Sequence, residues 1–280
     1  MTALLIALVG MATAANLGGV DEDCKDVATE IQSQIVKGTG DYDDAAQADF
    51  LLNYFAMATT FSPLHGPIPG KQGTGIVSLE LAVIPPLSCE RRLVLGASKT
   101  EDTNKAPAAP RPRIGMVFNK VGPIIPYAGL GYVPPVTVFG TRNVIVSGEA
   151  GFGMLAGKRV QWGMRYHFTL MKTIAEIATP FSADEEEQLD FYMGSTFGLD
   201  AMVGMKFDAL KPYLALGFTD ASTFFYIGDD AVVGNNTSPY AGLTGSLGVQ
   251  YTKDWMDFAG EFYTAPGVIY TARLRGGVRF

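Results

Sequence analysis

The last eleven residues, Tyr270-Thr-Ala-Arg-Leu-Arg-Gly-Gly-Val-Arg-Phe280, alternate between two kinds of side chain. In an extended strand this alternation separates an apolar face from a basic one. The basic face carries Arg273, Arg275 and Arg279. In a soluble sheet the charged face would lie outside, whereas in a membrane barrel it would line the lumen. The stretch predicts a β-strand and leaves both environments open.

The same alternation recurs from about residue 75 onward. The segment before the last strand places Asp257 and Glu261 on the face that carries the three arginines in its neighbour. The pattern predicts ten antiparallel strands, with eight to twelve as the range, over residues 74–280. The other predicted strands are 77–83, 114–118, 128–132, 144–154, 160–170, 196–207, 214–218 and 241–251.

Connection lengths support a membrane barrel, because such barrels have short periplasmic turns and longer outer loops. If the first strand runs outward, the periplasmic connections are all short; they lie near 121–124, 157–159, 208–211 and 252–254. The outer connections are longer, except for a tight turn at 264–267; they lie near 85–110, 134–142, 173–188 and 227–238. This parity predicts an all-β membrane barrel with a periplasmic C-terminus.

The amino-acid composition argues against several other classes of protein. The chain has 280 residues, of which 48% are hydrophobic and 18% charged, with 33 glycines and a net charge of -7. Such a chain is too apolar for a disordered protein, and it has no basic cluster for nucleic acid. A soluble β-sandwich or barrel remains the alternative. Against it, the polar strand faces are mostly Gly, Ser and Thr with paired opposite charges, and lysine is scarce on them.

The terminal strand also carries a resemblance. With Tyr270, Leu274, Val278 and Phe280 on its apolar face, it resembles the C-terminal assembly signal of bacterial outer-membrane proteins. That resemblance implies insertion by the barrel-assembly machinery. It also implies a place in the outer membrane of a Gram-negative cell, in contact with lipid and lipopolysaccharide. It indicates architecture and location, and it indicates no particular activity.

The N-terminal region precedes the predicted barrel. An apolar run at 2–12, followed by Ala12-Thr13-Ala14, predicts a signal peptide over 1–15, with an N-terminal helix as the alternative because no Lys or Arg precedes the run. In the remaining segment, 16–73, a helix is expected at about 44–61, capped by Asp43 or Asp44 and ended by Pro63. The helix could plug the lumen, lie at the membrane interface or dock on a partner.

The two cysteines favour one of these choices. Cys24 and Cys89 can pair in an oxidising compartment, and closing the loop between them adds about 4 kcal/mol in the chain-entropy model. Cys89 follows the first predicted strand and so lies at the outer end of the barrel. If the cysteines pair, the N-terminal segment starts outside and its helix descends through the lumen.

Inward-facing charges form a predicted lumen network. Unpaired ions in a narrow interior are costly, so the near balance of acids and bases indicates mutual pairing, with selective conduction as the alternative. The network comprises Glu80, Arg113, Glu149, Arg165, His167, Asp200, Lys206, Asp257, Glu261, Arg273, Arg275 and Arg279.

Enzymatic chemistry has little support in the sequence. Only two histidines are present: His65 is expected in a periplasmic connection, and His167 is expected in the lumen, where Glu149 could approach it. A histidine satisfied by a lumen carboxylate explains this better than a catalytic base. We expect no enzyme activity, no metal site and no cofactor.

Two functions remain open at this stage. In the first, the barrel is a porin-like or gated channel for small or amphipathic solutes, and the N-terminal helix occludes its lumen. In the second, a sealed barrel anchors an envelope, adhesion or motility complex through protein partners. Balanced lumen charge favours the anchor, and a detachable helix would favour transport.

Overall fold

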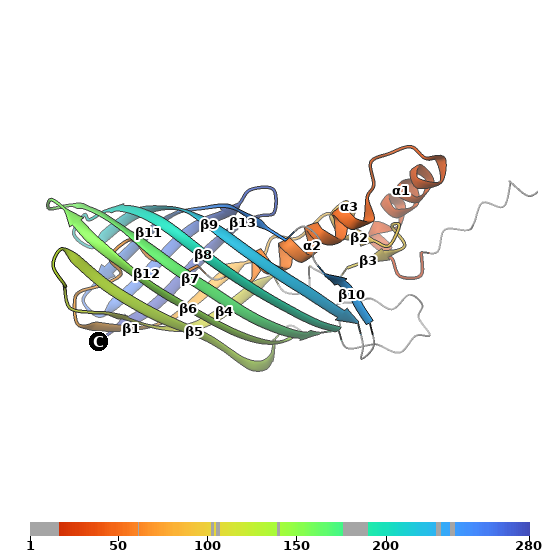
Figure 1. Ribbon diagram of the computed structural model, residues 1–280. Helices are drawn as coiled ribbons and strands as arrows, with labels where there is room; N and C mark the ends of the chain where they lie inside the picture. The colour runs from red at the N-terminus through yellow and green to blue at the C-terminus, as the bar shows by residue number, and fades with distance from the viewer. Residues whose placement is uncertain are drawn as a thin grey trace, which may run out of the picture.

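Ten long strands form a closed antiparallel barrel in the computed structural model (Figure 1). The structure describes residues 17–60, 62–101, 104, 107–138, 141–175, 190–227, 231–235 and 239–280; the predicted signal peptide lies outside these ranges. The barrel strands are β1 (Thr74–Val83), β4 (Ala108–Val117), β5 (Ile124–Val138), β6 (Thr141–Ala156), β7 (Val160–Ala175), β8 (Asp190–Met205), β9 (Leu210–Ile227), β11 (Ala241–Lys253), β12 (Met256–Ala265) and β13 (Ile269–Arg279). The predicted strand number and barrel class are confirmed.

The barrel closes through the pairing of its first and last strands. β1 pairs with β13 in a register that sets Glu80 opposite Arg275 and Leu81 opposite Leu274. Every other barrel strand pairs with its neighbours along the chain, and the short strand β10 (Ala231–Asn235) folds back on β9. Closure gives every barrel strand a partner on both sides, as spanning a bilayer requires.

The outer face of the barrel is apolar, as the alternation predicts. Leu274 of β13 is 57% exposed, and Leu216 of β9 is 62% exposed. Their sequence neighbours Arg273, Arg275 and Ala215 are buried. An inside-out pattern of this kind matches a barrel with lipid outside and a polar interior.

Strand β4 begins earlier than the sequence predicts. Pro110 and Pro112 made the stretch before Ile114 read as a connection, yet it pairs with β1 from Ala108 to Val117. The ladder from β4 to β5 covers only Arg113–Val117, so both prolines lie where one edge of β4 has no strand partner. Proline is tolerated at such an edge because no amide hydrogen is required there.

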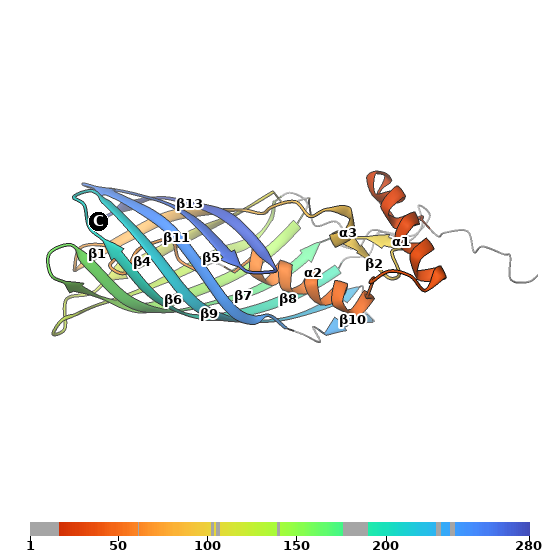
Figure 2. The same cartoon turned by 90° about the horizontal axis from the view of Figure 1, so that it is seen from above.

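The two ends of the barrel differ. Short turns join the strands at the end that holds the C-terminus, and the three long connections, β1 to β4, β7 to β8 and β9 to β11, lie at the opposite end together with all the helices (Figures 1 and 2). We call these the turn end and the helix end. The longer connection expected near 134–142 is wrong, because β5 continues to Val138 and β6 begins at Thr141. No helix among the described residues is long and apolar enough to cross a membrane.

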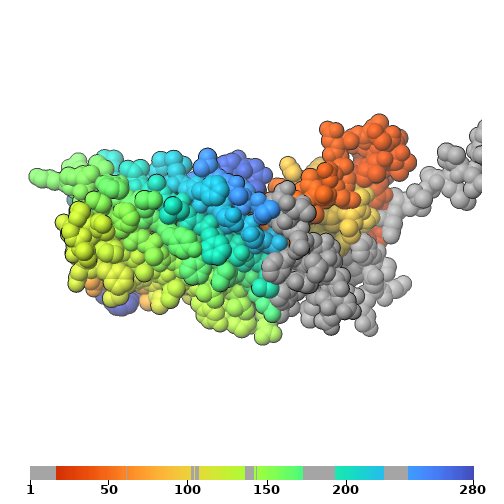
Figure 3. Space-filling model, viewed as in Figure 1, coloured from red at the N-terminus to blue at the C-terminus, as the bar shows by residue number. Residues whose placement is uncertain are grey.

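A small folded cap projects from the helix end (Figure 3). It contains η1 (Glu22–Cys24), α1 (Lys25–Lys37), α3 (Cys89–Arg92) and a two-stranded sheet of β2 (Leu93–Val94) and β3 (Lys99–Thr100). We define the cap as residues 17–42 and 88–101. Its buried side chains are Val20, Cys24, Ala28, Leu93 and Ala97.

Helix α2 (Asp44–Ala58) connects the cap to the barrel. Asp43 begins it, accepting hydrogen bonds from the backbone amides of Ala45 and Ala46. The helix ends at Ala58, three residues before the predicted end, with Thr59 as its C-cap. The described residues that follow, 59–60 and 62–73, are not helical and lead to β1 at the turn end. We call 59–73 the lumen segment.

Candidate functional site: the occupied lumen

The lumen segment is held mainly by its backbone carbonyl groups. Arg273 Nη2 donates to the Thr60 carbonyl at 2.9 Å, and Arg165 Nη1 donates to the Pro63 carbonyl at 2.5 Å. Nearer the turn end, Gln250 Nε2 donates to the Pro69 carbonyl at 2.9 Å. These donors come from β13, β7 and β11, so three separate parts of the barrel wall hold one strip of backbone.

The local sequence explains why the wall must supply these bonds. Pro63, Pro67 and Pro69 lack amide hydrogens and keep the chain from coiling into a helix. An extended chain without a strand partner leaves its carbonyl groups unsatisfied, which is costly when they are buried. Side-chain donors that project inward from the barrel meet this need.

One glycine makes room for the segment. A side chain on Gly153 of β6 would overlap the Pro67 carbonyl oxygen and would lie 2.5 Å from Ile68 Cγ1. Only glycine therefore allows the lumen segment to lie this close to the wall at that height.

Buried charges form four groups around the segment. In the first, Glu80 pairs with Arg111 and lies 3.8 Å from Arg113, which also pairs with Glu149. Glu149 Oε2 lies 2.9 Å from His65 Nε2, on the lumen segment. The group thus joins three wall strands to the segment through alternating charge.

The second group is centred on Asp200. Arg165 donates to one oxygen of Asp200 through Nε at 3.0 Å and through Nη2 at 2.6 Å. His167 Nε2 lies 3.4 Å from the same oxygen. Because Arg165 also holds the Pro63 carbonyl, Asp200 orients the arginine that fixes the segment.

The third group is centred on Asp257, at the turn end. Asp257 pairs with Arg275 through one oxygen and with Arg279 through the other, and it accepts from Gln250 Nε2 at 2.9 Å. Arg279 also donates to the Pro69 carbonyl at 2.6 Å. The same two donors, Gln250 and Arg279, thus bridge the carboxylate and the segment.

The fourth group contains Arg273. Its guanidinium lies 3.8 Å from Glu261 and 3.7 Å above the ring of Tyr263, and it donates to Ser62 Oγ at 2.7 Å. Glu261 accepts from the Tyr213 hydroxyl at 2.9 Å. Removing either Arg273 or Glu261 would take away the nearest opposite charge of the other.

Two residues depart from their expected places. His65 lies inside the lumen, not in a periplasmic connection, because the chain reaches β1 only after crossing the barrel. His167 is buried in the lumen opposite Glu149 on the neighbouring strand, as expected, but its ring lies beside Asp200, and His65 is the histidine that contacts Glu149. Lys206 lies beyond the end of β8 and is exposed, so it is outside the paired groups.

Arg111 is a buried barrel charge that the sequence reasoning missed, and Lys211 of β9 is another. Arg111 is fully buried between Glu80 and Ser147 Oγ, which it reaches at 3.0 Å. The signal was present, because Arg111 and Arg113 share the alternation of β4. The flanking prolines hid it by making the stretch look like a loop.

The helix end of the lumen is filled differently. The last turns of α2 bury Tyr54, Ala56 and Met57 against apolar residues of the wall: Ala221, Tyr263, Ala265 and Ile269. Leu52 packs on another part of the wall, formed by Ala82, Ile145 and Met171. The expectation that the helix itself descends through the lumen is therefore only partly met. The helix occupies the mouth, and the extended segment occupies the rest.

The cap is locked by the disulfide between Cys24 and Cys89, which spans a sequence separation of 65 residues. Asp44 links the cap to α2 by accepting from the Gly96 amide at 2.8 Å and from the Tyr42 hydroxyl at 2.8 Å. Burial and the neighbouring Asp44 carboxylate raise the pKa of Tyr42 well above its usual range. The cap and the helix thus form a continuous structure above the mouth.

The chemistry for a metal site is lacking in what the structure describes. The one group of three potential ligands within the described ranges is Asp23 with Cys24 and Cys89. The two sulfur atoms are bonded to each other, so no thiolate is left to bind a metal.

Comparison with known proteins adds the following. No family model matches the chain. No curated protein matches it either. Among solved structures, it is similar to the translocator domain of the autotransporter NalP from Neisseria meningitidis, with 10% identity, 74% of this chain and 88% of that chain covered, and a TM-score of 0.38.

Two other solved structures show a likeness of the same order. Ail, the attachment invasion locus protein of Yersinia pestis, has 11% identity over 75% of this chain and all of that chain, with a TM-score of 0.31. The KdgM porin has 8% identity over 73% of this chain and 98% of that chain, with a TM-score of 0.26. Likeness at this level says nothing about what the chain does.

Proposed function

We propose that the protein is a sealed barrel of the bacterial outer membrane that holds the disulfide-closed cap at the cell surface. The carrying observation is the chain of contacts along the lumen segment, in which Arg273, Arg165 and Gln250 bind its backbone at three heights. An interior filled by bonded backbone and paired charge supports an anchor better than a pore.

The packing around the segment supports the same reading. The hollow between Ser62, Arg165 and Tyr263 has a volume of about 0 Å³ available to water. Conduction needs a continuous hydrated path with sites that an ion can leave. The absence of room for a water molecule in this hollow supports the sealed barrel.

Orientation follows from connection lengths. The helix end has the three long connections, and the turn end has only short ones; in outer-membrane barrels long connections face outside and short turns face the periplasm. The exposed side chains of Tyr270, Leu274, Val278 and Phe280 suit recognition by the barrel-assembly machinery and contact with lipid and lipopolysaccharide. The cap would then meet envelope or extracellular protein partners.

A gated channel is the second candidate. Its support is the polar character of the contacts below Thr60, since water can replace a hydrogen bond to a carbonyl more readily than it can replace an apolar contact. In this alternative the lumen segment moves aside to admit a small or amphipathic solute.

Recordings in planar bilayers separate the two functions. The full chain should be silent, both oxidised and after reduction of the disulfide. A variant with residues 62–70 replaced by a Gly-Ser sequence of equal length should conduct, and heat-modifiable gel mobility should show that it is still a folded barrel. Steady conductance of the unmodified chain would overturn the sealed anchor and support the channel.

Labelling of intact cells tests the orientation. An epitope inserted after Gly38, in the exposed turn between α1 and α2, should bind antibody without permeabilisation. The matched control carries the same epitope at Gly157, in a turn at the opposite end, and should bind antibody only after permeabilisation. The reverse pattern would place the cap in the periplasm.

A further inference from the structure

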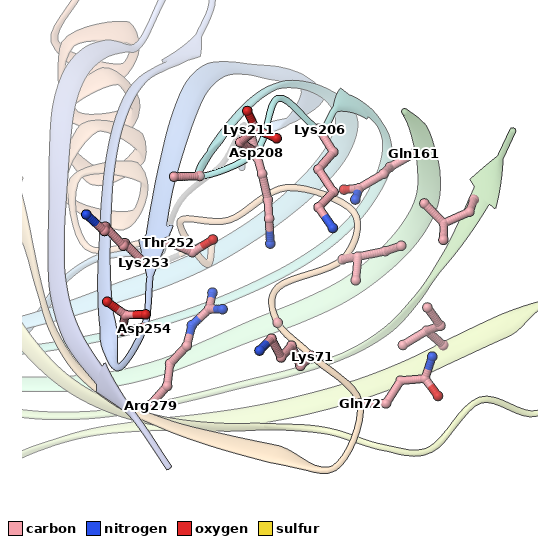
Figure 4. A pocket seen from close by; sticks show the side chains of 15 residues that line it. Lys71, Gln72, Gln161, Lys206, Asp208, Lys211, Thr252, Lys253, Asp254 and Arg279 are labelled. Atoms are coloured by element: carbon pink, nitrogen blue, oxygen red, sulfur yellow. The ribbon is translucent and has the colours of Figure 1, made fainter. Parts of the chain in front are cut away.

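The turn end of the barrel contains an open pocket of about 520 Å³ (Figure 4). Its walls come from the lower lumen segment, from the turns after β8 and β11, and from Gln161 of β7 and Arg279 of β13. The volume falls within the range of small-molecule sites, about 300–1,000 Å³. Arg279 is shared with the contacts that close the lumen, through Asp257 and the Pro69 carbonyl, but the lysines of the lining take no part in those contacts.

Positive charge dominates the lining. Lys71, Lys206, Lys211, Lys253 and Arg279 line the pocket, against the carboxylates of Asp208 and Asp254. Figure 4 shows Lys206, Lys211 and Arg279 aimed into the same space from different elements, whereas Asp208 points the other way.

The two acids have a local reason to be present. Asp208 and Asp254 both adopt positive φ angles, of 46° and 53°, in the tight turns that carry them. Aspartate tolerates this left-handed conformation better than most residues. The turns account for the aspartates, and they do not account for the lysines.

Lys211 is the decisive residue. It is only 7% exposed, and within the described ranges its side chain forms no hydrogen bond or ion pair. Asp257 attracts it, but that carboxylate is already bound by Arg275, Arg279 and Gln250. Arg279 and Lys206 repel it. Lys211 therefore lines the open pocket with more neighbouring positive than negative charge, and an anion that enters the pocket would offset this repulsion.

Gln161 adds a second polar group to the pocket. It is 3% exposed and lines the pocket, and none of the described residues bonds to its side-chain amide. In Figure 4 the amide lies beside Lys206. It can donate two hydrogen bonds to an acceptor that the lysines attract.

We propose that this pocket binds the phosphate group of a small organic phosphate that enters from the periplasm. Lysine ammonium groups are mobile point charges with three donors each, which suits a tetrahedral oxyanion rich in acceptors. The apolar side chains of Ile68 and Ile125, which also line the pocket, suit the organic part of the ligand. A phospholipid headgroup presents the same chemistry.

Calorimetric titration of the full chain in a zwitterionic detergent tests the site, with pyrophosphate and glycerol phosphate as probes. We expect saturable binding of at least one probe, weakening as salt is added. Lys211→Met should weaken binding at least tenfold, and Gln161→Leu should weaken it less. The matched control, Lys158→Met, alters an exposed lysine on a neighbouring turn and should leave affinity unchanged.

Fold integrity is checked separately. Because Lys211→Met removes an uncompensated buried charge, the variant should resist urea at least as well as the unmodified chain. Loss of binding with an intact barrel therefore reports on the site. Absence of binding by both probes, or equal affinity in Lys211→Met, would overturn the proposal.

Competition identifies the source of the phosphate. Displacement of the bound probe by a soluble short-chain phosphatidylglycerol, with no displacement by short-chain phosphatidylcholine, would assign a lipid headgroup. Probe binding that neither lipid affects would assign a free solute. Both outcomes uphold the oxyanion site. Conductance is a different readout, so the proposed seal and this site can fail independently.

Discussion

The two halves of the occupied lumen are filled by different means. At the helix end, α2 satisfies its own backbone and offers side chains such as Met57 to an apolar wall. Toward the turn end, the carbonyl groups of the lumen segment accept hydrogen bonds from side chains of the wall, namely Arg165, Gln250 and Arg279. The conformation of the filling chain thus determines the chemistry of the wall around it.

The difference teaches how a narrow barrel can bury so many charges. A helix needs only a surface that fits its side chains, because its hydrogen bonds are internal. An extended chain needs hydrogen-bond donors for its carbonyl groups. Arginine side chains are long enough to reach these carbonyl groups from the barrel wall, and they bring a positive charge with them. Each such arginine then requires an acid, as Arg165 requires Asp200. The paired charges follow from the need to hold backbone.

The largest expected effect comes from breaking the lower contact at Arg165. Arg165→Met leaves the Pro63 carbonyl without its donor and leaves Asp200 with only His167 beside it. We expect a loss of about 4 kcal/mol in the free energy of unfolding, because a buried charge loses its partner. Urea unfolding in lipid vesicles, followed by gel mobility, measures this loss.

Lys158→Met is the control for Arg165→Met, since it removes an exposed cation from a turn and should change stability by less than about 0.5 kcal/mol. An Arg165→Met variant as stable as this control would mean that the lower contacts do not hold the segment.

A smaller loss is expected from the upper half. Met57 is fully buried against the wall, so Met57→Ala should cost about 3 kcal/mol through lost contacts and the cavity left behind. The matched control is Met116→Ala, a methionine on the outer face of β4 where lipid fills the space. Equal effects of the two substitutions on urea unfolding would contradict the packing described for α2.

The smallest effect is expected where the wall binds backbone only. Pro63→Ala keeps the carbonyl that Arg165 binds, so the cost should stay near 1 kcal/mol, from greater freedom of the unfolded chain. Pro63→Ala changes the residue that accepts this hydrogen bond, and Arg165→Met removes the donor. Comparing the two losses of stability therefore tests whether the wall holds the carbonyl group. A loss for Pro63→Ala as large as that for Arg165→Met would show that the proline ring, not the carbonyl, is what the wall holds.

Much of the barrel could be predicted from the sequence. Alternation is a local property, so it identified the strands and their inward faces, including Glu80 on β1 and Asp257 on β12. Closure and strand number followed from counting. The first part of β4 was not predicted, because a strand with one unpaired edge tolerates prolines that a strand paired on both sides excludes.

The path of the lumen segment could not be predicted in the same way. The peptide around His65 has no periodicity, and its contacts reach residues more than 80 positions away, such as Glu149. The cysteine positions gave the only clue, since a link between Cys24 and Cys89 requires the chain to cross the barrel. They could not tell whether a helix or an extended chain makes the crossing.

The disulfide also determines how the molecule carries mechanical load. The loop that it closes contains α1, α2, the lumen segment and β1, and its two ends meet in the cap. A pull on the chain before Cys24 therefore passes across the sulfur atoms to Cys89 and on toward β4, and residues 25–88 carry no tension. Under oxidising conditions, a partner that pulls on the residues before Cys24 therefore applies force to the rim of the barrel and not to the lumen segment. Once the bond is reduced, the same force runs down the axis of the lumen.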